Sequence, residues 1–189
     1  SIPNSQFPIP KKRQAFGHIP NKTAISALLT LKTMDFEIIK PLLEDLKNPD
    51  EEVRLRATEK LWEIWFRQRG MAGLEAIQYA NSFLKVGHIE KAESILNKLI
   101  EDLPDFAEAW NRRAVLYYSI GEYKKAIKDC LMVVKLNPYH FGAFHGLGLC
   151  YTALGQYKEA IHAFRQALDI QPYAIENQRL ILECTAKLS

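Results

Sequence analysis

Residues 107–140 read AEAWNRRAVLYYSIGEYKKAIKDCLMVVKLNPYH. The first part of this segment places Trp110, Ala114 and Tyr117 on one face of a helix, because these positions are spaced by four and three residues. Gly121 then interrupts the pattern, and a second apolar stripe with helical spacing follows it. Glycine readily adopts the left-handed backbone that ends a helix. The segment therefore predicts two amphipathic helices joined by a tight turn.

The same pattern recurs every 34 residues, both before and after this segment. Five columns share the period: Gly87, Gly121 and Gly155; Ala92, Ala126 and Ala160; Pro104, Pro138 and Pro172; Ala80, Ala114 and Gly148; Phe83, Tyr117 and Tyr151. Glycine suits the turn, a small residue lets two helices approach, and proline ends the second helix. Such repeated helix pairs bury their apolar faces only by stacking on one another, so the columns predict an all-α solenoid.

The repeated residues resemble the tetratricopeptide repeat. The resemblance rests on Trp110, Ala114, Tyr117, Gly121, Tyr123, Ala126 and Pro138, and on Leu147, Gly148, Tyr151, Gly155, Tyr157, Ala160, Phe164, Ala167 and Pro172. It covers residues 73–174 as three units, 73–106, 107–140 and 141–174. The first unit matches least well, since Ala76 replaces a bulky aromatic residue, and in the second unit Arg113 replaces a usual leucine. The resemblance implies a right-handed α–α superhelix.

The segments that flank the three units predict three further parts. Residues 1–20 hold four of the nine prolines, which predicts an extended arm. Residues 21–70 predict a helical N-terminal region, either a cap for the solenoid or a single unit similar to a HEAT repeat. Its aromatic residues, Trp62 among them, are expected to pack on the first unit. Residues 175–189 predict a helix that caps the apolar face of the last unit.

Composition narrows the class of protein. The chain has 189 residues, of which 48% are hydrophobic and 25% charged, and its formal charge is +3, which is typical of a soluble globular protein. Residues 71–189 carry thirteen basic and thirteen acidic residues, so a nucleic-acid partner is disfavoured, although RNA binding by a helical repeat stays an alternative. No apolar run is long enough to span a membrane. Three scattered cysteines predict free thiols in a reducing compartment, the cytoplasm or a plastid stroma.

No constellation of residues predicts catalysis. The five histidines and three cysteines lack the spacing of a zinc site, and no phosphate-binding glycine motif is present. Cys130 and Cys150 lie on apolar helix stripes, which favours buried, inert thiols over nucleophiles. The chain begins at Ser1, so an earlier targeting peptide stays open. We therefore expect a binding protein that is not an enzyme and needs neither cofactor nor metal.

The resemblance implies that the first helix of each unit lines a concave groove for a partner segment. The inner face that packing leaves free predicts the following partner-binding residues: Ile77, Asn81, Glu108, Asn111, Arg112, Val115, Tyr118, Gly142, His145 and Leu149. Asn111 and Arg112 are candidates to hold a main chain or a carboxylate, or they are simply solvated. Gly142 and Gly146 indicate that space is needed, for a partner side chain or, the favoured interpretation, for a neighbouring helix.

One subclass of the family holds the acidic C-terminal tail of a chaperone. The places that its members use correspond here to Ile77, Asn81, Arg112, Gly142 and Gly146, and only Asn81 has the expected type. This comparison predicts that a chaperone tail is not the partner. The main hypothesis is an adaptor for another protein or peptide segment, and the alternative is self-association through Trp62 and Trp65 or through the proline-rich arm.

Overall fold

The computed structural model describes residues 36–189, and residues 39–189 form one compact unit. The expected arm at residues 1–20 and the start of the N-terminal region lie outside the described residues. A first helical segment spans residues 36–45. It is followed by α2 (Glu51–Arg67), α3 (Gly70–Lys85), α4 (Ile89–Asp102), α5 (Ala107–Ser119), α6 (Tyr123–Leu136), α7 (Phe141–Ala153), α8 (Tyr157–Ile170) and α9 (Ile175–Ala186).

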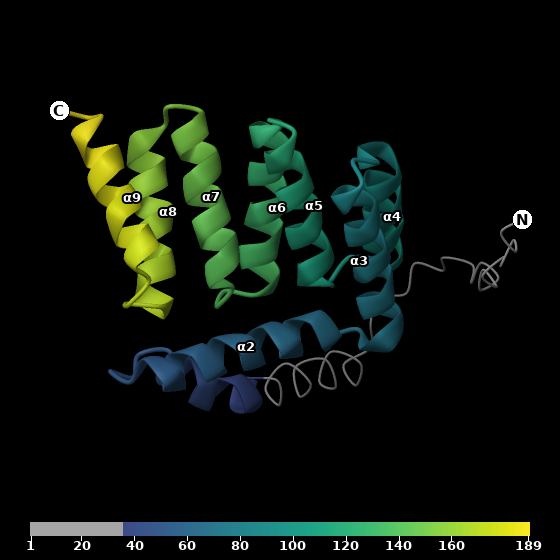
Figure 1. Ribbon diagram of the computed structural model, residues 1–189, viewed down its shortest axis with the longest axis horizontal. Coiled ribbons are helices and arrows are strands. Elements are labelled where there is room, and N and C mark those ends of the chain that lie inside the picture. The colour runs from purple at the N-terminus through teal and green to yellow at the C-terminus, as the bar shows by residue number, and fades with distance from the viewer. Residues whose placement is uncertain (1–35) are drawn as a thin grey trace, which may run out of the picture. The chain divides into compact units, whose positions relative to one another are not determined.

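The helices from α3 to α8 form three antiparallel pairs that stack side by side, and α9 follows the last pair (Figure 1). Within residues 36–189 no strand is present. The predicted all-α solenoid is confirmed. None of the helices in this part of the chain is both long and apolar enough to cross a bilayer.

The periodic glycines end the first helix of each pair. Gly87, Gly121 and Gly155 have φ angles of +77°, +79° and +71°, in the region that side chains with a Cβ atom rarely adopt. Each lies in a turn just before the second helix begins. The conformation that the spacing predicts for these residues is therefore present in all three pairs.

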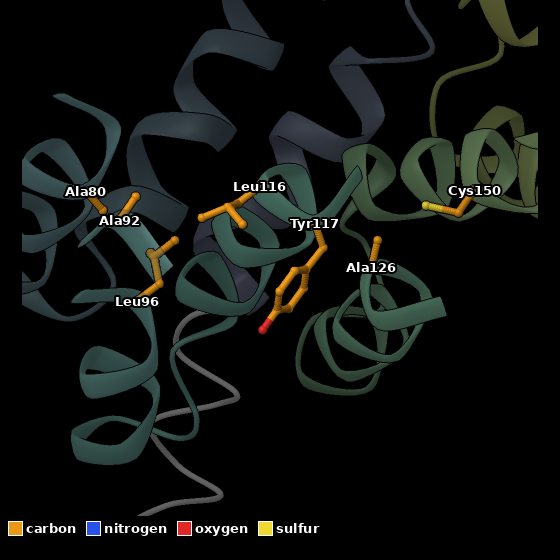
Figure 2. Packing of buried hydrophobic residues seen from close by; sticks show 7 residues of the cluster. All are labelled: Ala80, Ala92, Leu96, Leu116, Tyr117, Ala126 and Cys150. Carbon is orange, nitrogen blue, oxygen red and sulfur yellow. The ribbon is translucent and has the colours of Figure 1, made fainter. Parts of the chain in front are cut away.

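The core consists of small and large residues that alternate between neighbouring pairs. One cluster joins the first two pairs to Cys150 of α7, and Figure 2 shows its members: Ala80, Ala92, Leu96, Leu116, Tyr117, Ala126 and Cys150. Gly148 occupies the column that is alanine in the first two units. A Cβ atom there would lie 2.3 Å from the Phe164 ring, so the larger aromatic residue of α8 explains the change to glycine.

Arg113, which departs from the repeat pattern, is held by a polar network. Its guanidinium donates to both carboxylate oxygens of Asp129, at 2.7 and 2.8 Å, and to Asn97 at 2.7 Å. The hydrogen bond to Asp129 is the main reason that the pKa of Arg113 is raised. A bidentate pair of this kind positions both partners, so Arg113 links α4, α5 and α6 where other units would use apolar contact.

Helix α2 begins at a clear capping site. The Asp50 side chain accepts a hydrogen bond from the Glu52 amide at 2.9 Å, and acidic residues fill the first turn. In Figure 1, α2 runs across the lower ends of α5, α7 and α9. Its partners there include Arg112, Phe141 and Tyr173.

The expectation that the aromatic face of α2 packs on the first unit is wrong for two of its three aromatic residues. Phe66 does pack against the cluster that contains Ile77 of the first unit. Trp62 and Trp65 instead contact His140 and Phe141 at the start of the third unit. The reason is the direction of α2, which crosses the ends of the pairs instead of stacking on the first one.

Helix α9 packs against the last pair, as its apolar pattern predicts. Leu180 and Cys184 are buried in a cluster with Ala160, Ile161 and Phe164 of α8. On the opposite side of α9, Ile175 and Leu182 are exposed.

Candidate functional site

The ten predicted partner-binding residues divide into a covered group and an accessible group. Ile77 and Glu108 are 0% exposed and Asn111 is 6% exposed, whereas Val115 and Tyr118 are 49% and 38% exposed. The other five, Asn81, Arg112, Gly142, His145 and Leu149, are partly buried. All ten lie on the first helices of the pairs, so repeat position alone does not decide which of them a partner reaches.

The covered group lies beneath α2, and we call it the covered edge: Glu108, Asn111, His140 and Gly142. The Trp65 ring stacks on His140 with 4.7 Å between centroids, and Trp62 meets the His140 ring edge to face at 5.2 Å. A Cβ atom on Gly142 would lie 2.8 Å from the Trp62 ring. The space at Gly142 is therefore filled by a side chain of this chain's own α2.

Gly146 behaves differently, although it lies one turn further along α7. A Cβ atom on Gly146 would lie 3.3 Å from the sulfur of Cys130 in α6. The favoured interpretation of the two glycines, space for a neighbouring helix of the solenoid, thus holds for Gly146, while Gly142 admits the Trp62 ring.

A buried carboxylate organises the covered edge. Glu108 accepts hydrogen bonds from the Asn111 amide at 3.0 Å and from the Arg112 guanidinium at 2.7 Å. The His140 Nε2 lies 3.2 Å from the second oxygen of Glu108. The Ala143 amide donates to His140 Nδ1 at 3.0 Å, so the proton of a neutral imidazole lies on Nε2, which donates to Glu108.

These hydrogen bonds limit what the covered edge offers to a partner. The Asn111 amide and the Arg112 guanidinium, two predicted contacts for a main chain or carboxylate, are already bound to Glu108. The Arg112 guanidinium also lies 4.6 Å from the Phe66 ring centroid. Sequence reasoning missed His140, Trp62 and Trp65 as parts of this site, and the only local signal was the place of His140 just before α7, where it accepts the hydrogen bond that caps the helix.

Helix α2 is firmly attached. Leu61 is 0% exposed and Trp65 is 6% exposed. Burying each large apolar side chain contributes roughly 1.5–3 kcal/mol. Gln171 adds a hydrogen bond from its amide to the Thr58 hydroxyl at 3.1 Å, and the Arg54 guanidinium lies 4.3 Å from the Tyr173 ring centroid. Helix α2 is therefore a permanent wall of the site.

The accessible group forms what we call the open surface: Asn81, Val115, Tyr118 and Leu149. Asn81, Val115 and Leu149 occupy the same position of successive units, so they form one row across the first helices. Tyr118 lies one turn beyond Val115, and its ring is 5.5 Å from that of Tyr123. Partial burial raises the pKa of Tyr118, which keeps its hydroxyl neutral at physiological pH. His145 is engaged elsewhere, since its Nδ1 lies 2.6 Å from Asn177 of α9.

Two cavities border α2. The larger has a volume of about 350 Å³ and lies between α2 and α3, where its lining consists of Glu63, Phe66, Arg67, Leu74, Ile77, Gln78 and Asn81. The smaller has a volume of about 170 Å³ and lies between α2 and the turn from α8 to α9. The larger cavity is continuous in sequence position with the open surface, because Asn81 belongs to both.

The three thiols lie in the core, as expected for inert cysteines. Cys130, Cys150 and Cys184 are free and buried. Burial raises the pKa of Cys130 and raises that of Cys150 to about 11, so both thiols are protonated at neutral pH. Among residues 36–189, no group of three or more histidine, cysteine or acidic side chains is placed to hold a metal ion.

Comparison with known proteins agrees with this architecture. The family model for the tetratricopeptide repeat matches residues 107–140 and 142–173. A TPR repeat-containing protein of Rhizobium etli is 33% identical over 96 residues, which are 51% of this chain and 47% of the relative. The chain thus spans about half the length of that curated relative.

Solved structures share the fold. The first TPR domain of Spaghetti (RPAP3), bound to the HSP90 peptide SRMEEVD, is 23% identical with a TM-score of 0.59, and the match covers 61% of this chain and 91% of that one. The second TPR domain of human RPAP3, in complex with the HSP70 peptide SGPTIEEVD, is 26% identical with a TM-score of 0.56, and the match covers 58% of this chain and 92% of that one.

The expectation that excludes an acidic chaperone tail is wrong. It is overturned by the human RPAP3 domain, which is similar to this chain and holds the tail peptide of a chaperone. The exclusion considered five fixed places on the inner helices. It left out the cations that lie beyond those places, such as Arg67, which α2 brings to the cavity beside Asn81.

The matched repeats, the relative and the shared fold agree with the helix pairs and their glycine turns. The fold is that of a protein-interaction scaffold. The chain is a tetratricopeptide-repeat protein.

Proposed function

We propose that this chain binds an extended segment of a partner protein on the open surface. The observation that carries the proposal is the exposure of Val115 and Tyr118, at 49% and 38%, on the inner helix of the central pair. Their neighbours Asn81 and Leu149 continue the row onto the first and third pairs. Exposed apolar and aromatic side chains that lie together on a concave face are typical of an interaction site.

Rigidity explains how the surface works. The stacked pairs bury a continuous core, and α2 braces the ends of α5 and α7, so the surface keeps its shape before the partner arrives. Only the partner segment then loses conformational freedom on binding, which favours affinity from a small contact area.

The acidic C-terminal tail of a chaperone is the first candidate partner. The similarity to the second TPR domain of human RPAP3, which holds SGPTIEEVD, supports this candidate. The larger cavity supports it as well, because an acidic peptide that reaches the open surface would also meet Arg67 beside Asn81.

Fluorescence anisotropy with labelled SGPTIEEVD tests the proposal. We expect saturable binding by the wild-type chain and a loss of roughly tenfold in affinity for Tyr118→Ala, which corresponds to about 1.4 kcal/mol. Tyr79→Ala is the matched control, since Tyr79 is a 55% exposed tyrosine of α3 outside the open surface. Equal affinities for wild type and Tyr118→Ala would place the peptide elsewhere, and an absence of binding would reject the chaperone tail as partner.

A further inference from the structure

The larger cavity has an apolar floor and a polar rim. Phe66 of α2 and Leu74 and Ile77 of α3 supply the apolar lining, and the volume is about 350 Å³. That volume is at the lower end of the range for small-ligand sites. It suits one or two side chains better than a cofactor.

The rim offers hydrogen-bonding groups that the protein does not use. Gln78 is exposed and Asn81 is partly buried, and both line the cavity. Within residues 36–189, neither side-chain amide has a hydrogen-bond partner in the protein. Each amide supplies both a donor and an acceptor, which is what the main chain of an extended peptide requires.

The charge beside the cavity is positive by one unit. Glu63 accepts from the Lys60 ammonium at 2.8 Å and lies 3.5 Å from the Arg67 Nε, so two cations face one carboxylate. The hydrogen bond from Lys60 is the main cause that lowers the pKa of Glu63, which is ionised at neutral pH. Arg112, the other cation close to Phe66, is already paired with Glu108. The rim therefore favours an acidic neighbour.

The cavity exists only because α2 is in place. Phe66 and Arg67 come from the last turn of α2, and the buried Leu61 and Trp65 hold that helix against the rest of the unit. The repeat pattern alone would leave Ile77 and Asn81 on an open inner face. With α2 present, the same residues become the floor and rim of a preformed pocket.

We infer that this cavity, between α2 and α3, binds an aliphatic side chain of the partner segment that is adjacent in sequence to an aspartate or glutamate. The aliphatic group lies on Phe66, Leu74 and Ile77. The amides of Gln78 and Asn81 hold the neighbouring peptide bonds, and Arg67 faces the acidic residue. The inference rests on the proposed function and adds the anchor residue that the open surface by itself does not specify.

Selection from a random linear peptide library displayed on phage tests this inference without assuming a partner. We expect the enriched peptides to share Leu, Ile, Val or Met beside Asp or Glu. Synthetic copies of these peptides should lose roughly tenfold in affinity for Gln78→Trp, because the indole fills the cavity. Ser82→Trp is the matched control, since Ser82 is an exposed polar residue of α3 that does not line the cavity, and we expect its affinity to stay within about twofold of wild type.

Two further variants sharpen the result. Asn81→Ala removes one amide without filling the cavity, and Arg67→Glu reverses the surplus charge, so each should weaken the same peptides by roughly fivefold or more. Circular dichroism and urea unfolding establish that each variant is folded. If Gln78→Trp does not fold, the Asn81 and Arg67 variants decide.

The outcomes separate this inference from the proposed function. If no peptide is enriched, the proposed function fails and the inference fails with it. If the enriched peptides are weakened by Tyr118→Ala but not by Gln78→Trp, the proposed function stands and the cavity inference is overturned. Enriched peptides that lack an acidic residue beside the aliphatic one overturn it too.

Discussion

The covered edge and the open surface are built from the same kind of helix, yet one is closed and the other accessible. Glu108 and Asn111 of the covered edge are almost completely buried, whereas Val115 and Tyr118, one and two turns further along α5, are exposed. The difference comes from α2, which crosses the first turns of α5 and α7 and ends before it reaches Val115. In a solenoid, therefore, the repeat decides which residues face inward, and a flanking segment decides which of these a partner reaches.

Removal of Trp65 should produce the largest effect on the covered edge. Trp65 is 6% exposed and stacks on His140, so Trp65→Ala leaves a cavity beneath α2 and should lower the free energy of unfolding by about 3–5 kcal/mol. Urea denaturation measures this change. Tyr118→Ala on the open surface should change it by only about 0.5 kcal/mol or less. Similar losses for both variants would show that the two parts do not differ in packing.

Removal of Glu108 should have the next largest effect. Glu108→Ala leaves the Asn111 amide, the Arg112 guanidinium and the His140 Nε2 proton without their acceptor, and should cost about 2–3 kcal/mol. The control is Glu122→Ala, because Glu122 pairs with Lys125 at 3.6 Å on the exposed surface and should contribute less than about 1 kcal/mol. If the two variants lost equal stability, the buried carboxylate would not organise the covered edge.

The two helical glycines of α7 provide the finest comparison. Alanine has a higher helix propensity than glycine by about 1 kcal/mol, which favours both substitutions. At Gly142 the added Cβ lies 2.8 Å from the Trp62 ring, while at Gly146 it lies 3.3 Å from Cys130 Sγ. We expect Gly142→Ala to be less stable than Gly146→Ala by about 1 kcal/mol. Thermal unfolding of both variants measures the difference, and the opposite order would mean that Trp62 does not need the space at Gly142.

Much of the solenoid follows from the sequence because its information is local. The period of 34 residues, the turns at Gly87, Gly121 and Gly155, and the buried alanine columns depend on spacings of three and four residues within a helix. Each helix pair repeats the same short-range solution. The inner faces of α3, α5 and α7 follow in the same way, and the row from Asn81 to Leu149 needs no further information.

The accessibility of those inner faces did not follow from the sequence. The helical pattern of α2 is visible in its residues, but its direction depends on the turn at Gly70 and on the fit of Trp62 against Gly142, which are far apart in the chain. The hydrogen bond between Glu108 and His140 likewise joins the starts of two units. Such contacts depend on complementary shape and charge between distant segments. The helix pairs were therefore evident from periodic spacing, while the closed edge, the open surface and the cavity between α2 and α3 were decided by tertiary packing.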